Sequence, residues 1–219
     1  MFLVPWGVTS GHIYGAFEWD SGLQAACSSG CEDIIKLMIK NGAKSSGSAF
    51  NGACEGGRVD LVKMLYWSNH DFPVANYFIS LDRDINISSG FKGACENGHI
   101  GVIDLLLPDM LDLNEGFLWA CIYGRVDVAK RLISNGALNL TIIKNKGFSW
   151  LRDDVNNLEI VNLLIDIGAN SWNEGLRSAS QRGDIEVMKL MISKGANDWS
   201  VHKRAKQDTN VLKLLLGKQ

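Results

Sequence analysis

Hydrophobic and polar residues follow one another along this chain with the spacing expected of short amphipathic helices. Leu23, Ala26 and Cys27 lie at offsets of three and four residues, which brings them onto one face of a helix, and the same spacing recurs from Phe91. A second apolar segment follows each such face, as in Ile34 to Met38 after Cys27. We interpret the pattern as pairs of short helices, in which the second helix is apolar over a wide arc because neighbours cover it on both sides.

The helix pair recurs as a repeat with a basic period near 27 residues, measured between turn positions such as Gly30 and Gly57. In several copies a turn glycine, an acidic residue, paired aliphatic residues and a closing Gly-Ala keep the same register. The predicted units lie near residues 20–43, 47–67, 89–109, 115–137, 147–169 and 174–196, with a C-terminal capping unit at 198–219. We expect residues 1–19 to form an N-terminal cap, residues 68–88 to be an irregular insertion, and residues 1–219 to be a single domain.

Each recurring residue has a local structural reason. Gly30 permits the positive backbone angle that ends the first helix, and Gly42 and Ala43 close the second helix. Asp33 falls in the first turn of the second helix, where the helix dipole favours an acid. Because a single hairpin of this size cannot bury both of its faces, stacked copies must cover one another. The sequence therefore predicts an all-α solenoid of stacked antiparallel helix-turn-helix repeats with a concave surface.

The segment Gly-x-x-Asp/Glu-Val/Ile-Val/Ile-Lys-x-Leu/Met-Ile/Leu-x-x-Gly-Ala resembles the second half of an ankyrin repeat. In the first half, Ser21 to Cys27 match the family's Thr-Pro-Leu-His-x-Ala-Ala at the leucine and one alanine, and the proline and histidine are absent. The commonest ankyrin period is about 33 residues, so the shorter step implies an ankyrin-like solenoid with short loops in place of β-hairpins. Copies with Trp-Asn-x-Gly-Leu, as at Trp172 to Leu176, are similar to ankyrin proteins of large DNA viruses of amoebae. The resemblance spans residues 19 to 216 and implies a role in protein–protein interaction.

The charge balance narrows the class of partner. The chain has 22 basic and 24 acidic side chains, a net charge of −2 and 46% hydrophobic residues, so it creates no strong field for nucleic acid or an anionic membrane. Residues Met1 to Trp6 are apolar, but they have neither the basic region of a signal peptide nor the length of a membrane span. We expect a soluble cytoplasmic protein, in the host cytoplasm if it is viral, with a protein as its partner.

The candidate chemistry does not point to an enzyme. Cys27, Cys54, Cys95 and Cys121 share one repeat position, and equivalent positions on stacked helices lie about 8 to 10 Å apart, which is too far for a disulfide or for a shared zinc ion. We interpret these residues as small core-filling side chains. The four histidines are scattered, and no phosphate loop, nucleophile elbow or zinc-protease motif occurs. We expect no catalytic residues, no metal and no cofactor.

Two groups of residues are candidates for partner binding. Trp119 and Trp150 occupy a first-helix position that is small elsewhere, and with Leu118 and Ile122 beside them they could form an aromatic hot spot on the concave groove. The alternative is that the indoles fill space around the irregular unit at 145–157. Tyr77 and Phe78 belong to the irregular insertion, which is either a binding loop or a decayed repeat that bridges its neighbours.

The leading hypothesis is a protein–protein interaction module that binds a protein partner through the concave helix face and loops. We expect such a module to be a monomer. The alternative is a structural or self-assembling component of a larger particle.

Overall fold

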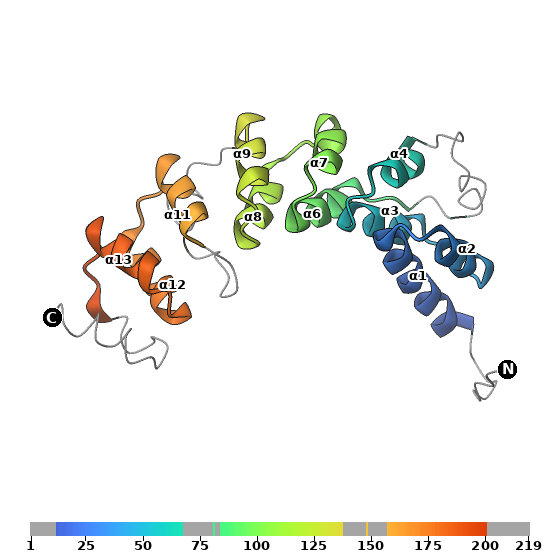
Figure 1. Ribbon diagram of the computed structural model, residues 1–219, viewed down its shortest axis with the longest axis horizontal. Coiled ribbons are helices and arrows are strands. Elements are labelled where there is room, and N and C mark those ends of the chain that lie inside the picture. The colour runs from blue at the N-terminus through green and yellow to red at the C-terminus, as the bar shows by residue number, and fades with distance from the viewer. Residues whose placement is uncertain (1–11, 68–80, 82–83, 138–147, 149–156, 201–219) are drawn as a thin grey trace. The chain divides into compact units, whose positions relative to one another are not determined.

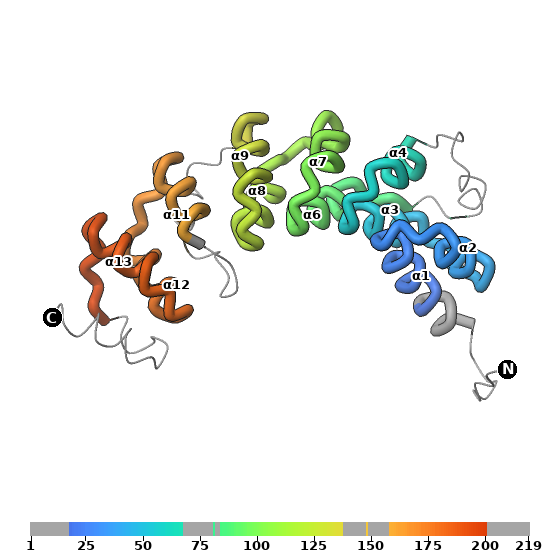
Figure 2. Tube along the Cα trace, viewed as in Figure 1, coloured from blue at the N-terminus to red at the C-terminus, as the bar shows by residue number. Residues whose placement is uncertain are grey.

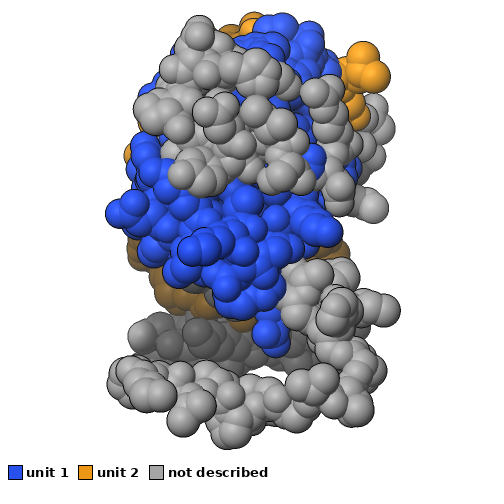
Figure 3. Space-filling view, turned by 90° about the vertical axis from the view of Figure 1, so that its right-hand side faces the viewer, with its two compact units in different colours: residues 1–110 blue, residues 111–219 orange. Residues whose placement is uncertain are grey.

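The computed structural model describes residues 12–67, 81, 84–137, 148 and 157–200, all of which belong to an all-α architecture without β-strands (Figure 1). The chain divides into two compact units, residues 1–110 and residues 111–219, which are coloured separately in Figure 3. Trp150, Tyr77 and Phe78 lie outside the described residues, as do residues 201–219 of the predicted C-terminal cap and most of the predicted insertion.

The first unit consists of helix pairs joined by short turns. Its helices are α1 (His12–Ser29), α2 (Glu32–Lys40), α3 (Ser46–Glu55), α4 (Val59–Trp67), α6 (Ile87–Asn97), α7 (Ile100–Leu106) and the 3-10 helix η1 (Leu107–Asp109). The first helices α1, α3 and α6 pack in sequence order, and the second helices α4 and α7 pack against each other (Figure 2). Helix α1 runs without a break through residues 19 and 20, where the sequence predicted the end of a cap.

The second unit repeats the same plan. Its helices are α8 (Asn114–Ile122), α9 (Val126–Ser134), α11 (Asn157–Asp166), α12 (Trp172–Arg182) and α13 (Ile185–Ser193). Helix α8 pairs with α9 and α12 pairs with α13, while α11 contacts both α9 and α13. The second helices of this unit therefore form a continuous row.

Glycine serves two separate purposes in these hairpins. Gly57 ends the first helix of its repeat with a φ of 67°, and a Cβ there would lie 2.5 Å from Nδ1 of His99 in the next repeat. Gly52 allows a close approach of two helices, because a Cβ at this position would lie 2.0 Å from the backbone oxygen of Gln24 in α1. The turn glycines match the sequence prediction, whereas the backbone contact between α1 and α3 is a feature that periodicity did not reveal.

The four cysteines of the shared repeat position are core residues, as predicted. Cys27, Cys54, Cys95 and Cys121 have 0% exposure. Burial raises the pKa of Cys27 to about 12, because a thiolate would lose its hydration there, and it raises the pKa of Cys54 and Cys95 to about 12 as well. These thiols remain protonated at neutral pH and act as small apolar side chains.

Short loops connect the repeats, and an Asx side chain holds the loop in place in two of them. Oδ1 of Asp20 accepts hydrogen bonds from the backbone N–H of Lys44 at 2.7 Å and of Ser45 at 3.0 Å. Asn173, at the equivalent position of α12, accepts from the N–H of Asn197 and Asp198 at 2.7 and 3.0 Å. The first helix of each of these repeats therefore binds the chain that leaves its own second helix, and no β-hairpin is needed there.

One expectation about the second helices is wrong for α2. Ile34 is 44% exposed and Leu37 is 51% exposed, although the sequence predicted that neighbours cover this helix on both sides. Ile35, on the opposite face, is fully buried. The physical reason is the position of α2 in the stack, because no described second helix precedes it.

Candidate protein-binding surface

Helix α8 carries apolar side chains around its whole circumference. Phe117, Ala120 and Cys121 are buried in the second unit, while Leu118 and Ile122 are only half-buried on another side of the helix. Because residues four positions apart share a helix face, these two form a pair. An apolar helix that is not fully covered is unusual on a soluble surface and marks a candidate contact site.

Trp119 extends this surface. Its ring lies 6.3 Å from the ring of Tyr123, one turn further along the helix, and the two planes are tilted by 44°. Its indole Nε1 lies 3.5 Å from Oε1 of Glu115, at the outer limit of a hydrogen bond. The described residues of the predicted hot spot are Leu118, Trp119 and Ile122, all half-buried. Together with the half-buried Tyr123, which the sequence did not select, they form what we call the α8 surface.

In the first unit, the repeat position of Trp119 does not face a concave groove, although the sequence predicted that it does. Gly52 and Gly93 occupy the equivalent position in α3 and α6. A Cβ at Gly93 would lie 2.8 Å from Cγ of Glu55 in α3, just as one at Gly52 would meet α1. In the first unit this position therefore faces the preceding first helix and not an open groove. On α8 the side chain of Trp119 is half-buried and its ring lies beside that of Tyr123.

The Leu118 and Ile122 positions are different, because their equivalents in the first unit carry polar side chains. Nε2 of Gln24 donates to both carboxylate oxygens of Glu55, at 2.9 and 3.1 Å. Lys92 and Glu96 form an ion pair at 3.7 Å on α6. The same helix face is thus polar and hydrogen-bonded in the first unit and apolar on α8, so an apolar partner segment would find its complement on α8 alone among these helices.

A recurring hydrogen bond between repeats was missed by sequence reasoning. Nε of Arg58 donates to the backbone oxygen of Ser28 at 2.9 Å, and Nε2 of His99 lies 2.8 Å from the backbone oxygen of Glu55. Because a carbonyl oxygen only accepts, Nε2 of His99 carries the proton. Both residues directly follow a turn glycine, and both reach the end of the preceding first helix. The available signal was a polar side chain after successive turn glycines.

An acidic residue stabilises the start of α3. Oδ1 of Asp84 accepts hydrogen bonds from the N–H of Gly47 at 2.6 Å and from the hydroxyl of Ser46 at 2.9 Å, and its Oδ2 accepts from the hydroxyl of Ser45. Burial alone would raise the pKa of Asp84, but these hydrogen bonds outweigh it and lower the pKa below its ordinary value. Asp84 therefore helps to set the position of the N-terminal end of α3.

The described residues contain no group of three or more His, Cys, Asp or Glu side chains arranged to hold a metal ion. Within the same ranges, no helix is both long and apolar enough to cross a membrane.

Comparison with known proteins supports the fold. Among solved structures, the chain is similar to the ankyrin repeat domain of human ASB11, with a TM-score of 0.61 and 18% sequence identity over 90% of this chain and 97% of that one. No family model matches the sequence, and no curated protein matches it. The likeness confirms the predicted all-α ankyrin-type architecture, while the similarity to viral ankyrin proteins stays a prediction.

Proposed function

We propose that this chain is a non-catalytic recognition module that binds a protein partner through the α8 surface. The observation that carries the proposal is the change from polar to apolar side chains at equivalent positions, from Gln24 and Glu55 in the first unit to Leu118 and Ile122 on α8. An apolar surface with an aromatic side chain is typical of the centre of a protein interface. The predicted contribution of Trp150, Tyr77 and Phe78 remains part of this proposal.

The proposed compartment is the cytoplasm, or the host cytoplasm if the protein is viral. All five cysteines are free thiols, four of them buried, and a fold whose thiols act as core side chains suits a reducing compartment. A nearly neutral net charge of −2 again favours a protein over nucleic acid as the partner.

Substitution of Trp119 by alanine tests the proposal. The partner would first be isolated by affinity capture with the full chain and identified by mass spectrometry, and its affinity would then be measured by calorimetry. Truncation of a hot-spot tryptophan costs about 2 kcal/mol or more, so we expect the dissociation constant of Trp119→Ala to rise by roughly 30-fold.

Trp67→Ala is the matched control, because Trp67 on α4 is 53% exposed and lies outside the α8 surface. We expect this variant to bind the partner as the unchanged chain does. If Trp119→Ala keeps its helical circular dichroism and binds with unchanged affinity, the α8 surface is not the binding site.

A further inference from the structure

The first hairpin presents a stacking surface that later repeats bury. Ile34 of α2 is 44% exposed, whereas Val102, Val128, Ile160 and Val187, at the equivalent position of the later second helices α7, α9, α11 and α13, are 0 or 1% exposed. Leu61 in α4 is half-buried. Within the two units, α7, α11 and α13 each pack against the second helix before them, so we infer that this position faces the preceding second helix. For α2 no such helix is described.

Trp19 on α1 also occupies a position that contacts the preceding repeat in a later copy. Its equivalent on α12, Trp172, packs against Phe148 of the preceding repeat with the ring centroids 5.9 Å apart. Trp19 is 36% exposed. Two positions on two helices thus indicate that no described repeat covers this side of α1 and α2.

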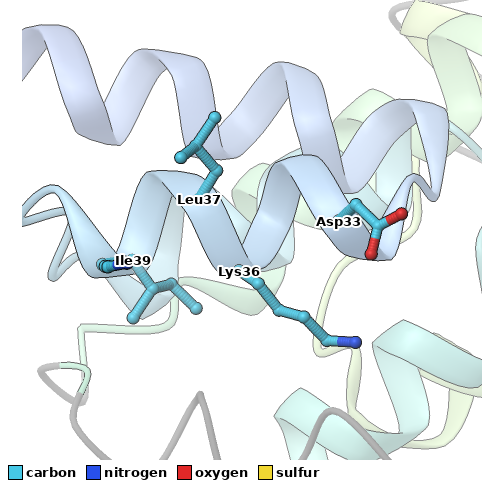
Figure 4. Close-up of a pocket in the computed structure, with 5 residues that line it drawn as sticks. Asp33, Lys36, Leu37 and Ile39 are labelled. Atoms are coloured by element: carbon cyan, nitrogen blue, oxygen red, sulfur yellow. The ribbon is translucent and has the colours of Figure 1, made fainter.

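Four of the exposed residues of α2 form one stripe along the helix. Asp33, Ile34, Leu37 and Lys40 are all exposed, and their spacing of three, four and seven residues places them on the side opposite the buried Ile35. Figure 4 shows Leu37 in the middle of α2, pointing away from the side on which Lys36 and Ile39 lie, with Asp33 near the N-terminal end. An open surface hollow of about 430 Å³ lies along the helix. Its lining residues are Asp33, Lys36, Leu37, Ile39 and Lys40.

We propose that the α2 stripe pairs with the α2 stripe of a second copy of this chain, in an antiparallel, two-fold symmetric contact. The stripe is apolar in its middle, acidic at the N-terminal end and basic at the C-terminal end. In an antiparallel pair, Asp33 therefore faces the partner's Lys40, and Lys40 faces the partner's Asp33, while Ile34 and Leu37 meet across the axis. In a parallel pair like charges would meet. This charge arrangement makes the stripe complementary to itself.

In the proposed dimer, the partner's α2 takes the place of the preceding second helix, which α2 does not have among the described residues. In α7, α11 and α13 the position of Ile34 is buried, and each of these helices packs against the second helix that precedes it in its own unit. The partner's α2 supplies such a helix to α2. Exposed ion pairs contribute little individually, so the dimer is expected to be weak and to dissociate at low concentration or high salt. The sequence favoured a monomer, and the exposed stripe is the reason for departing from that expectation.

Charge exchange on the full chain tests the proposal by sedimentation equilibrium over a range of concentrations at low salt. We expect Asp33→Lys to raise the dimer dissociation constant by about tenfold, because two attractive contacts become repulsive, and Lys40→Asp to do the same. The double variant Asp33→Lys/Lys40→Asp restores both pairs and returns the constant to within about threefold of the unchanged chain. A folding defect could not produce such a rescue.

Glu186→Lys is the matched control, because Glu186 occupies the position of Asp33 on α13, where the neighbouring Val187 is buried. We expect no effect on association from this variant. Asp33 and Lys40 also complement the dipole of α2, so thermal unfolding of each variant separates helix stability from dimer formation. A chain that is monomeric at every concentration overturns the proposal, and the stripe is then covered by residues 1–11 of the same chain or by solvent. A double variant that fails to restore the dimer also overturns it.

Discussion

At the scale of single residues, the repeat depends on positions where a side chain is excluded. Gly57 combines a positive φ with contact to His99, so it is required by both backbone and packing. Gly52 has ordinary helical geometry, and its requirement is a backbone contact between α1 and α3. The sequence could predict Gly57, because it stands at a fixed distance before an acidic residue in the repeat. In the sequence alone Gly52 looks only like a poor helix former, because the backbone that it contacts belongs to Gln24, 28 residues earlier.

Gly52→Ala tests this contact. The added Cβ would lie 2.0 Å from the backbone oxygen of Gln24, and backbone cannot move aside cheaply in a packed helix pair. We expect a loss of about 2 to 3 kcal/mol in the free energy of unfolding, the upper range for an overpacked core, measured by urea denaturation.

Gly101→Ala provides the comparison, because Gly101 lies exposed in α7 and a Cβ there would meet only the Val59 side chain at 3.1 Å. The gain in helix propensity of about 1 kcal/mol offsets that contact, so the change in stability should stay below about 1 kcal/mol. An equal loss in the two variants would show that the α1–α3 contact is looser than the structure indicates.

At the scale of the helices, side chains from one repeat satisfy backbone groups of another. Arg58 and His99 bind carbonyl groups at the end of the preceding first helix, and Asp84 binds the N-terminal end of α3. Helix ends leave such groups without partners inside the helix, so each bond both satisfies the backbone and fixes the distance between neighbours. Periodicity predicted that the helices exist and where they turn, but these bonds depend on the geometry of stacking and were not visible in the pattern.

The Asp84 contact makes stability depend on pH in a defined direction. The folded pKa of Asp84 is lowered, so the folded state binds fewer protons than the unfolded state at this site. The stabilisation is therefore present above the unfolded pKa of about 3.9 and is lost as the pH falls through the folded pKa. Asp84→Asn should lose less than about 1 kcal/mol at pH 7, since Asp84 as a whole is an exposed residue and solvent weakens its contacts. Between pH 5 and about pH 3 this variant should lose less further stability than the unchanged chain.

Urea unfolding of both proteins at several pH values measures this difference. Asp198→Asn is a suitable comparison, because hydrogen bonds from Ser200 lower the pKa of Asp198, and among the described residues its carboxylate accepts from Ser200 and from no helix end of another repeat. Identical acid profiles for Asp84→Asn and the unchanged chain would show that Asp84 does not stabilise α3.

At the scale of the whole molecule, the two candidate surfaces have different origins. The α8 surface was selected from the sequence because Trp119 stands where other repeats have a small residue, and the structure retains Leu118 and Ile122 as half-buried neighbours. The α2 stripe could not be selected in this way, because Ile34 and Leu37 match the aliphatic residues of every second helix. Its exposure follows from the absence of a described preceding repeat, which is a property of the stack and not of the residues.

The two surfaces should therefore act independently, since they share no residue and lie in separate compact units. We expect Trp119→Ala to dimerise with an unchanged dissociation constant, and Asp33→Lys to bind the captured protein partner with unchanged affinity, because the effects of independent substitutions add within about 0.5 kcal/mol. Calorimetry with the partner and sedimentation of both variants provide the four measurements. If Asp33→Lys weakens partner binding while Trp119→Ala does not, the partner recognises the first hairpin or its dimer, and the α2 stripe replaces the α8 surface as the binding site.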